Sequence, residues 1–228
     1  MTIYVELSKA IERGVAEQVT QWAQGILDEL VTGQRSTKAV SHPLGFLCLP
    51  IHRLNDEGVC IHLWGPRWHR ASVSTSPVHC HSWELLSWVL AGELHNQPVQ
   101  VTTDTEAPTH RVFEVHSGEV GDEIRATERL VRHRVHRTTE HRAGDRYRLP
   151  AGVFHQTLVP DAEDLVATVA LGRTRTGGLD LSLGGLHTTD HQVRRQLCGE
   201  QDTAAAAAAA LDAIADHHHD GELSHRDG

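Results

Sequence analysis

Two histidines separated by one residue, His79 and His81, are the residues of this sequence best suited to chemistry. Side chains alternate along an extended strand, so two residues at this spacing point to the same face. Neutral imidazoles bind iron, zinc, copper and nickel well and hold magnesium or calcium poorly. The pair therefore supplies half of a candidate transition-metal site.

A second segment supplies a third histidine. From Gly144 the chain reads Gly-Asp-Arg-Tyr-Arg-Leu-Pro-Ala-Gly-Val-Phe-His, in which Pro150 and Gly152 indicate a turn that presents His155. Three histidines on one side of an ion leave positions open for substrate and oxygen, the arrangement that non-haem iron oxygenases need.

Together the two segments resemble the two motifs of the cupin superfamily, a small β-barrel that holds one metal ion. The positions that match the motifs are His79, His81 and Gly92 in the first and Gly144, Pro150, Gly152 and His155 in the second. The resemblance implies a mainly β fold, a cupin (double-stranded β-helix, jelly-roll barrel), in which the three histidines are the metal ligands.

The glutamate of the first cupin motif is missing from its usual position, which holds Leu85. The nearest carboxylate, Glu84, falls on the opposite strand face under strict alternation. A neutral three-His site resembles that of the cupin thiol dioxygenases, in which the substrate thiolate supplies the missing negative charge. If a β-bulge turns Glu84 inward as a fourth ligand, the site is closer to quercetinase-like, acireductone-type or oxalate-degrading cupins.

The resemblance thus implies an enzyme with a mononuclear Fe(II) cofactor that oxidises a small amino-acid-like or thiol substrate, such as cysteine, with O2. Ni, Zn, Mn and Cu are the alternative metals. Tyr147 is a candidate catalytic residue that would donate a hydrogen bond to bound oxygen, and core packing is its alternative role. The competing functions are a metal-assisted isomerase or lyase and a non-enzymatic cupin binding protein, because the fold alone decides none of them.

Net charge, apolar runs and cysteine content limit the classes of molecule that this chain is expected to bind. The formal charge of −9 argues against a nucleic-acid binder, and no apolar run approaches the length of a membrane span. Four cysteines without zinc-ribbon spacing, and an N-terminus without a secretory signal pattern, favour a reduced cytoplasmic setting. We expect a small-molecule substrate and O2 as partners, without nucleic acid or membrane; the choice between monomer and homodimer stays open.

The remaining elements are expected to build and flank the barrel. We expect an N-terminal helix packed on the barrel within residues 1–40, the barrel in residues 41–198, and an Ala- and His-rich tail in residues 199–228. One apolar stripe predicts a single helix of about six turns; its residues are Leu7, Ile11, Val15, Val19, Trp22, Ile26 and Leu30.

Short apolar or alternating runs with turns between them predict antiparallel strands. They lie at residues 44–51, 58–64, 98–102, 110–116, 130–137 and 164–171. The stretch from Arg125 to Arg148 is dense in arginine, which indicates either a solvated strand face or one inward arginine that clamps a substrate carboxylate. Seven alanines, Ala204 to Ala210, favour a helix, and we expect the tail to bury little surface and to be dispensable.

Overall fold

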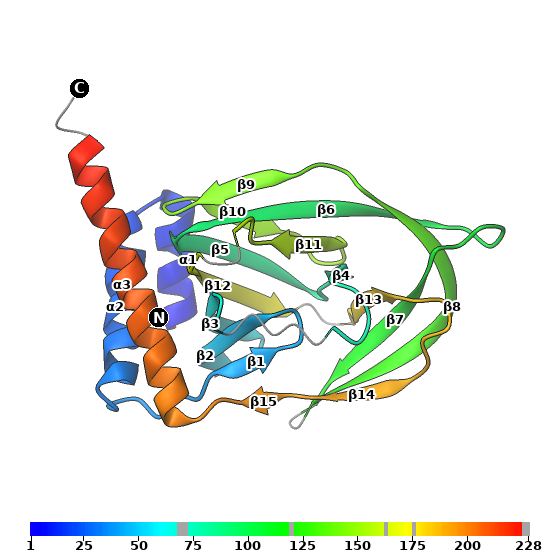
Figure 1. The fold of residues 1–228 in the computed structure, drawn as a ribbon, viewed down its shortest axis with the longest axis horizontal. Helices are drawn as coiled ribbons and strands as arrows, with labels where there is room; N and C mark the ends of the chain where they lie inside the picture. Colours follow the sequence, from blue (N-terminus) through cyan, green and yellow to red (C-terminus); the bar gives the residue numbers. More distant parts are fainter. Residues whose placement is uncertain (68–72, 119–120, 162–163, 175–176, 225–228) are drawn as a thin grey trace.

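Strands make up most of the chain after Val40, and they form two antiparallel sheets (Figure 1). The computed structural model describes residues 1–67, 73–118, 121–161, 164–174 and 177–224. Within these residues, the first sheet has seven strands in the order β10-β5-β12-β3-β2-β1-β15. The second has eight in the order β14-β8-β7-β13-β4-β11-β6-β9. The predicted mainly β, double-stranded β-helix fold is confirmed.

Strands form where the periodicity of the sequence predicts them, although β6 and β8 begin several residues earlier than predicted. The predicted strands at residues 44–51, 58–64, 98–102, 110–116, 130–137 and 164–171 correspond to β2, β3, β6, β7, β8 and β12. The strands are β1 (Val40–His42), β2 (Phe46–Leu54), β3 (Glu57–Trp64), β4 (His79–Cys80), β5 (Trp83–Ala91), β6 (Glu93–Thr103), β7 (His110–Ser117), β8 (Gly121–Val135), β9 (Thr139–Arg142), β10 (Arg146–Leu149), β11 (His155–Leu158), β12 (Val166–Thr174), β13 (Asp180–Gly184), β14 (His191–Arg194) and β15 (Gln196–Leu197).

The first sheet has an apolar core on each of its faces. On β3, Val59 and Ile61 pack against the helices, whereas Trp64 packs with Leu94 of the second sheet. This alternation assigns every second residue of the strand to the space between the two sheets. Side chains on that inner face are the ones that can build a site inside the barrel.

The second sheet closes on itself around a third core. Strand β8 pairs with β6 as well as with β7, so the strands β6-β8-β7-β13-β4-β11 form a ring of pairings. The residues of the third core come from these strands and their approaches: Val78, Cys80, Val99, Val112, Val131, Phe154 and Leu183. Closure removes free strand edges and holds the short strands β4 and β11 on both sides.

Two helices stand where the apolar stripe predicted one. Helix α1 (Ile3–Arg13) ends at Gly14, whose φ of 70° is left-handed, and α2 (Ala16–Val31) starts after Val15, which is 42% exposed. Glycine adopts this backbone conformation without strain, so the chain turns there although the spacing of apolar residues continues. Arg146 of β10 donates to the carbonyl oxygens of Ile11 and Glu12 and so ties the end of α1 to the barrel.

The C-terminal helix α3 (Glu200–Ser224) corrects the expectation of a loosely packed tail. Ala206, Ala207, Ala210 and Ile214 are fully buried, and α3 lies beside α2 over the first sheet (Figure 1). Alanine side chains are small, so two helix backbones can approach closely and still exclude water. Residues 225–228 of the predicted mobile end lie outside the described part. None of the described helices is long and apolar enough to span a membrane.

The packing of α3 predicts that its apolar face stabilises the whole fold. Replacing Ile214 by Ala should lower the free energy of unfolding by about 2–5 kcal/mol, the usual cost of a cavity in a core. Urea denaturation measures this change. The exposed Asp212→Ala variant of the same helix is the control and should stay within about 0.5 kcal/mol of the parent. Equal free energies of unfolding for the two variants would mean that the apolar face of α3 does not stabilise the fold.

Candidate metal centre

The three predicted histidines come together between the strands that carry the two motifs. His79 on β4 is the direct antiparallel partner of His155 on β11, and His81 directly follows the last residue of β4. One ligand nitrogen from each lies within 4.8 Å of the other two. The two motifs, far apart in the sequence, therefore form one cluster of imidazoles.

The spacing of the nitrogens fits a shared ion. The Nε2 atoms of His79 and His81 are 3.2 Å apart. Two nitrogens bound to one ion at about 2.0–2.1 Å, with an angle of about 90–110° between them, are separated by about 2.8–3.4 Å. The observed separation falls in that range, so this pair can bind one ion through small movements of the side chains.

Backbone carbonyls fix the orientation of two of the rings. Nδ1 of His79 lies 2.8 Å from the carbonyl oxygen of Pro77, and Nδ1 of His155 lies 3.0 Å from that of Val153. A neutral imidazole that donates from Nδ1 leaves the lone pair of Nε2 free, which is the usual arrangement of metal-binding histidines. Both rings are therefore held in the tautomer that a metal requires.

The loop around His81 is fixed by two further hydrogen bonds. The amide of Gly152 donates to the carbonyl oxygen of His81 (2.8 Å), and the amide of Ser82 donates to Oδ1 of Asp180 (2.6 Å). Gly152 has a φ of 76°, a conformation that favours glycine, which explains why a glycine stands at this position of the second motif. The turn before His155 thus also positions His81.

Burial keeps the three rings neutral. It lowers the pKa of His155 to about 3 and that of His79 to about 4, and it holds the pKa of His81 well below its ordinary value. Burial disfavours the charged imidazolium, and the neighbouring imidazoles act in the same direction. Metal binding needs the unprotonated ring, so the site is prepared for an ion near neutral pH.

Glu84 lies on the helix-facing side of β5. Its carboxylate forms an ion pair with Arg148, whose other nitrogen is 2.9 Å from a carboxylate oxygen of Glu12 on α1. Its neighbour Leu85 packs in the core between the sheets. The residue in the glutamate position of the motif is thus apolar, and the nearby carboxylate links β5 to β10 and α1.

Tyr147 lies in the core between the sheets. It is 9% exposed and packs with Leu85 and other inner residues of the barrel. Burial raises the pKa of its hydroxyl, and the nearby polar groups of Ser87, Asn96 and Thr168 act in the opposite direction. These surroundings are those of a packed core tyrosine.

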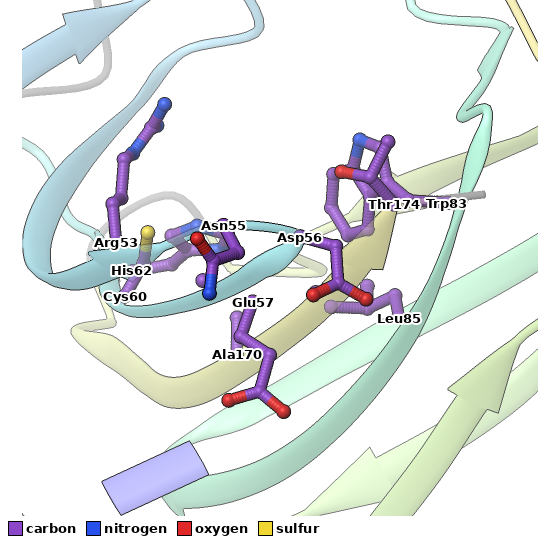
Figure 2. A pocket seen from close by; sticks show the side chains of 12 residues that line it. Arg53, Asn55, Asp56, Glu57, Cys60, His62, Trp83, Leu85, Ala170 and Thr174 are labelled. Atoms are coloured by element: carbon purple, nitrogen blue, oxygen red, sulfur yellow. The ribbon is translucent and has the colours of Figure 1, made fainter. Parts of the chain in front are cut away.

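A cavity of about 200 Å³ lies next to Trp83, and none of the three histidines is among its lining residues. Figure 2 shows Trp83 and Thr174 on one side of it and Cys60 and His62 on the other. The Trp83 ring also stacks on His81, with ring centroids 4.1 Å apart. It therefore stands between the cavity and that imidazole.

Glycine 172 makes room for this tryptophan. A Cβ atom at Gly172 would lie 3.0 Å from Cε3 of Trp83, which is closer than ordinary side-chain contacts. The glycine therefore allows the indole to lie against β12 and to form the wall of the cavity.

The arginine-rich stretch contributes ion pairs and hydrogen bonds on the surface. Arg125 pairs with Glu123, Arg132 with Asp104, and Arg142 with Glu93. The arginine that lines the cavity is Arg53, at the end of β2 and outside that stretch.

One cluster was not anticipated from the sequence. Cys48, Cys60 and His62 also place one ligand atom each within 4.8 Å of one another. The spacing of Cys60 and His62 signals a shared strand face, but adding Cys48 requires the register of the β2–β3 hairpin. A search for cysteine pairs at zinc-ribbon spacing misses such a group.

Comparisons with known proteins add little to these observations. No protein-family model matches the sequence, and no curated protein matches it. Among solved structures, the chain is similar to an uncharacterized conserved protein with a double-stranded β-helix domain from Klebsiella pneumoniae. The two share 15% identity over 61% of this chain and 84% of that chain, with a TM-score of 0.33. The description of the fold and the site therefore rests on this chain's own strands and side chains.

The cluster predicts a clear difference between two substitutions. His155→Ala should weaken metal affinity by more than about 100-fold, because even residues that only support a ligand contribute about 10–100-fold. Glu84→Gln should leave the affinity unchanged, because its carboxylate binds Arg148. Titration with a chromophoric chelator as competitor measures both. Equal loss in the two variants would mean that Glu84 is a ligand.

Half-buried His42, on β1, predicts how the free energy of unfolding depends on pH. The amide of Leu44 donates to Nδ1 of His42 (3.2 Å), and burial lowers the pKa of His42 to about 3. In the unfolded chain this ring titrates near its ordinary value of about 6.5. Below that pH the unfolded state binds a proton that the folded state does not, so the free energy of unfolding should fall as the pH drops toward 3.

The His42→Asn variant tests this contribution in the metal-free protein. Asparagine retains an acceptor for the Leu44 amide and does not titrate, so the slope against pH should become shallower by up to about 1.4 kcal/mol per pH unit. Urea denaturation between pH 4 and 7 measures the slope. His187→Asn, at an exposed position, is the control. An unchanged slope in His42→Asn would show that His42 is protonated in the folded protein.

Proposed function

We propose that this chain is a cupin-type metal-dependent oxygenase that binds Fe(II) at His79, His81 and His155 and oxidises a small thiol with O2. The observation that carries the proposal is the neutrality of the donor set: three imidazoles converge, while Glu84 is paired with Arg148. An ion held by neutral ligands keeps its full double positive charge. An anionic thiolate is therefore attracted more strongly than at a site that already contains a carboxylate.

The chain's own residues have distinct tasks in this proposal. The carbonyls of Pro77 and Val153 hold two of the ligand rings in the required tautomer. Trp83 shields His81 from the cavity, so water is excluded from that side of the ligand. The bound ion would supply a place where the thiolate and O2 meet.

A small substrate would fit the cavity, and movement of the Trp83 ring would open the way from there to the ion. Its volume of about 200 Å³ is below the range of about 300–1,000 Å³ that is typical of pockets for drug-sized ligands. Arg53 on its rim supplies a cation for the carboxylate of an amino-acid-like molecule. Cysteine combines a thiol with such a carboxylate and is the substrate that we would test first.

The proposed reaction needs no further reductant. A thiol RSH and O2 give the sulfinic acid RSO2H: the sulfur is oxidised, and both oxygen atoms of O2 are transferred to it. The thiol loses its proton when the thiolate forms. This proton is counted as the acid proton of the sulfinic acid product.

Oxygen uptake with matched substrates tests the proposal. Cysteine added to the anaerobic Fe(II) protein should change the Mössbauer spectrum of the iron, and air should then give cysteine sulfinic acid, detected by mass spectrometry. Serine has the same shape without the thiol and should do neither. The His155→Ala protein should consume oxygen only at the background rate.

Two outcomes would contradict the thiol assignment. If a thiol-free substrate is oxidised while no thiol perturbs the iron, the reaction is a different oxygenation. If no candidate substrate consumes oxygen, an isomerase, a lyase or a binding protein becomes the better account.

A further inference from the structure

The cluster of Cys48, Cys60 and His62 lies inside the same barrel as the three histidines but on a different pair of strands. Cys48 is on β2, and Cys60 and His62 are on β3. All three side chains are half-buried. Their ligand atoms, two sulfurs and one ring nitrogen, lie within 4.8 Å of one another.

The register of the hairpin explains why these side chains meet. Cys48 is directly opposite His62, and Pro50 is opposite Cys60. Cys60 and His62 are two residues apart and therefore share a strand face, and Cys48 is the cross-strand neighbour of the pair. The intervening Ile61 packs in the core on the helix side, so the cluster points between the sheets.

The framework of the cluster is rigid. Strand β3 pairs with β2 on one side and with β12 on the other, and β2 also pairs with β1. Phe46 packs against His62, with ring centroids 4.7 Å apart. Ligands on strands held from both sides keep their spacing, which a preformed metal site requires.

The cluster can also be reached by an ion. Cys60 and His62 line the cavity of about 200 Å³, together with Arg53 at its rim (Figure 2). The hydrogen bond between the two thiols holds the pKa of Cys60 well below its ordinary value and, together with burial, raises the pKa of Cys48, while the Arg53 guanidinium lowers both. The site thus has an entry path and one thiol that is readily deprotonated, and metal binding would displace the proton of the other.

We propose that Cys48, Cys60 and His62 form a second metal site, which binds a thiophilic ion of the Zn(II) or Cu(I) class. Two thiolates and one imidazole are soft ligands that select such ions, whereas three imidazoles also accept iron. Two thiolates neutralise the charge of Zn(II), whereas the histidine cluster leaves a divalent ion fully charged. The two sites therefore differ in the ions they select, and the second does not depend on the function proposed for the first.

Cobalt substitution tests the site directly. The chain of 228 residues carries the substitutions His217→Ala, His218→Ala and His219→Ala, which remove the histidine run in its last helix. Under reducing conditions, titration with Co(II) should produce the intense near-ultraviolet absorption of a thiolate–cobalt bond. Cys48→Ser and Cys60→Ser should each abolish this band, and Zn(II) or Cu(I), added separately, should displace the cobalt and show which ion binds more tightly.

Matched controls separate this site from the histidine cluster. Cys198→Ser removes a half-buried thiol elsewhere in the chain and should retain the band. His155→Ala should retain it too, so a failure of the proposed oxygenase site leaves this test intact. Loss of the band in His155→Ala but not in Cys60→Ser would overturn the proposal, as would its absence from the parent protein.

A second measurement needs no variant and covers the case in which the serine variants fail to fold. Cys48 and Cys60 of the parent are alkylated with and without Zn(II), and the rate at each cysteine is followed by mass spectrometry. Zn(II) should slow alkylation of both by at least 10-fold and leave Cys198 unchanged. Equal rates with and without the ion, or a Cys48–Cys60 disulfide that persists in the presence of reductant, would contradict the second site.

Discussion

The pairing of β4 with β11 is the contact on which the rest of the site depends. It sets His79 directly opposite His155, although 75 residues lie between them in the sequence. Both strands are very short, so their position is fixed by what surrounds them. The ring of six strands holds them laterally, and the Gly152 and Asp180 hydrogen bonds hold the segment that carries His81. The imidazoles thus converge because the sheet closes on itself.

The charged side chains near the two motifs leave the three histidines as a neutral set of ligands. The ligand rings are buried or half-buried, with lowered pKa values, while the carboxylates of Glu84 and Glu93 are paired with Arg148 and Arg142. Glu84 illustrates the consequence, because its contact with Arg148 couples the second motif to helix α1. A barrel organised in this way can hold a positive ion without a competing anion among the ligands. In the proposed function, an anionic thiolate would be the partner of that ion.

Local patterns were sufficient to predict much of this structure. Alternation and the two motifs predicted the mainly β fold and the convergence of the three histidines, because strand period and turn glycines depend on near neighbours. The break at Gly14 was missed because apolar spacing continues across it. The burial of α3 was missed because alanine carries a weak hydrophobic signal even where it is fully buried. The group of Cys48, Cys60 and His62 depends on a hairpin register that a β-bulge after Pro50 shifts, which no single stretch of sequence specifies.

The central claim is that one ion binds between His79, His81 and His155. Anomalous diffraction from crystals of the Fe(II)-loaded protein, measured at the iron absorption edge, tests it most directly. We predict a peak between the three rings, about 2.0–2.1 Å from each ligand nitrogen, the usual range for imidazole bound to a zinc-like ion. A peak bonded to the Glu84 carboxylate, or iron only at other positions while the three rings stay in contact with one another, would contradict the account.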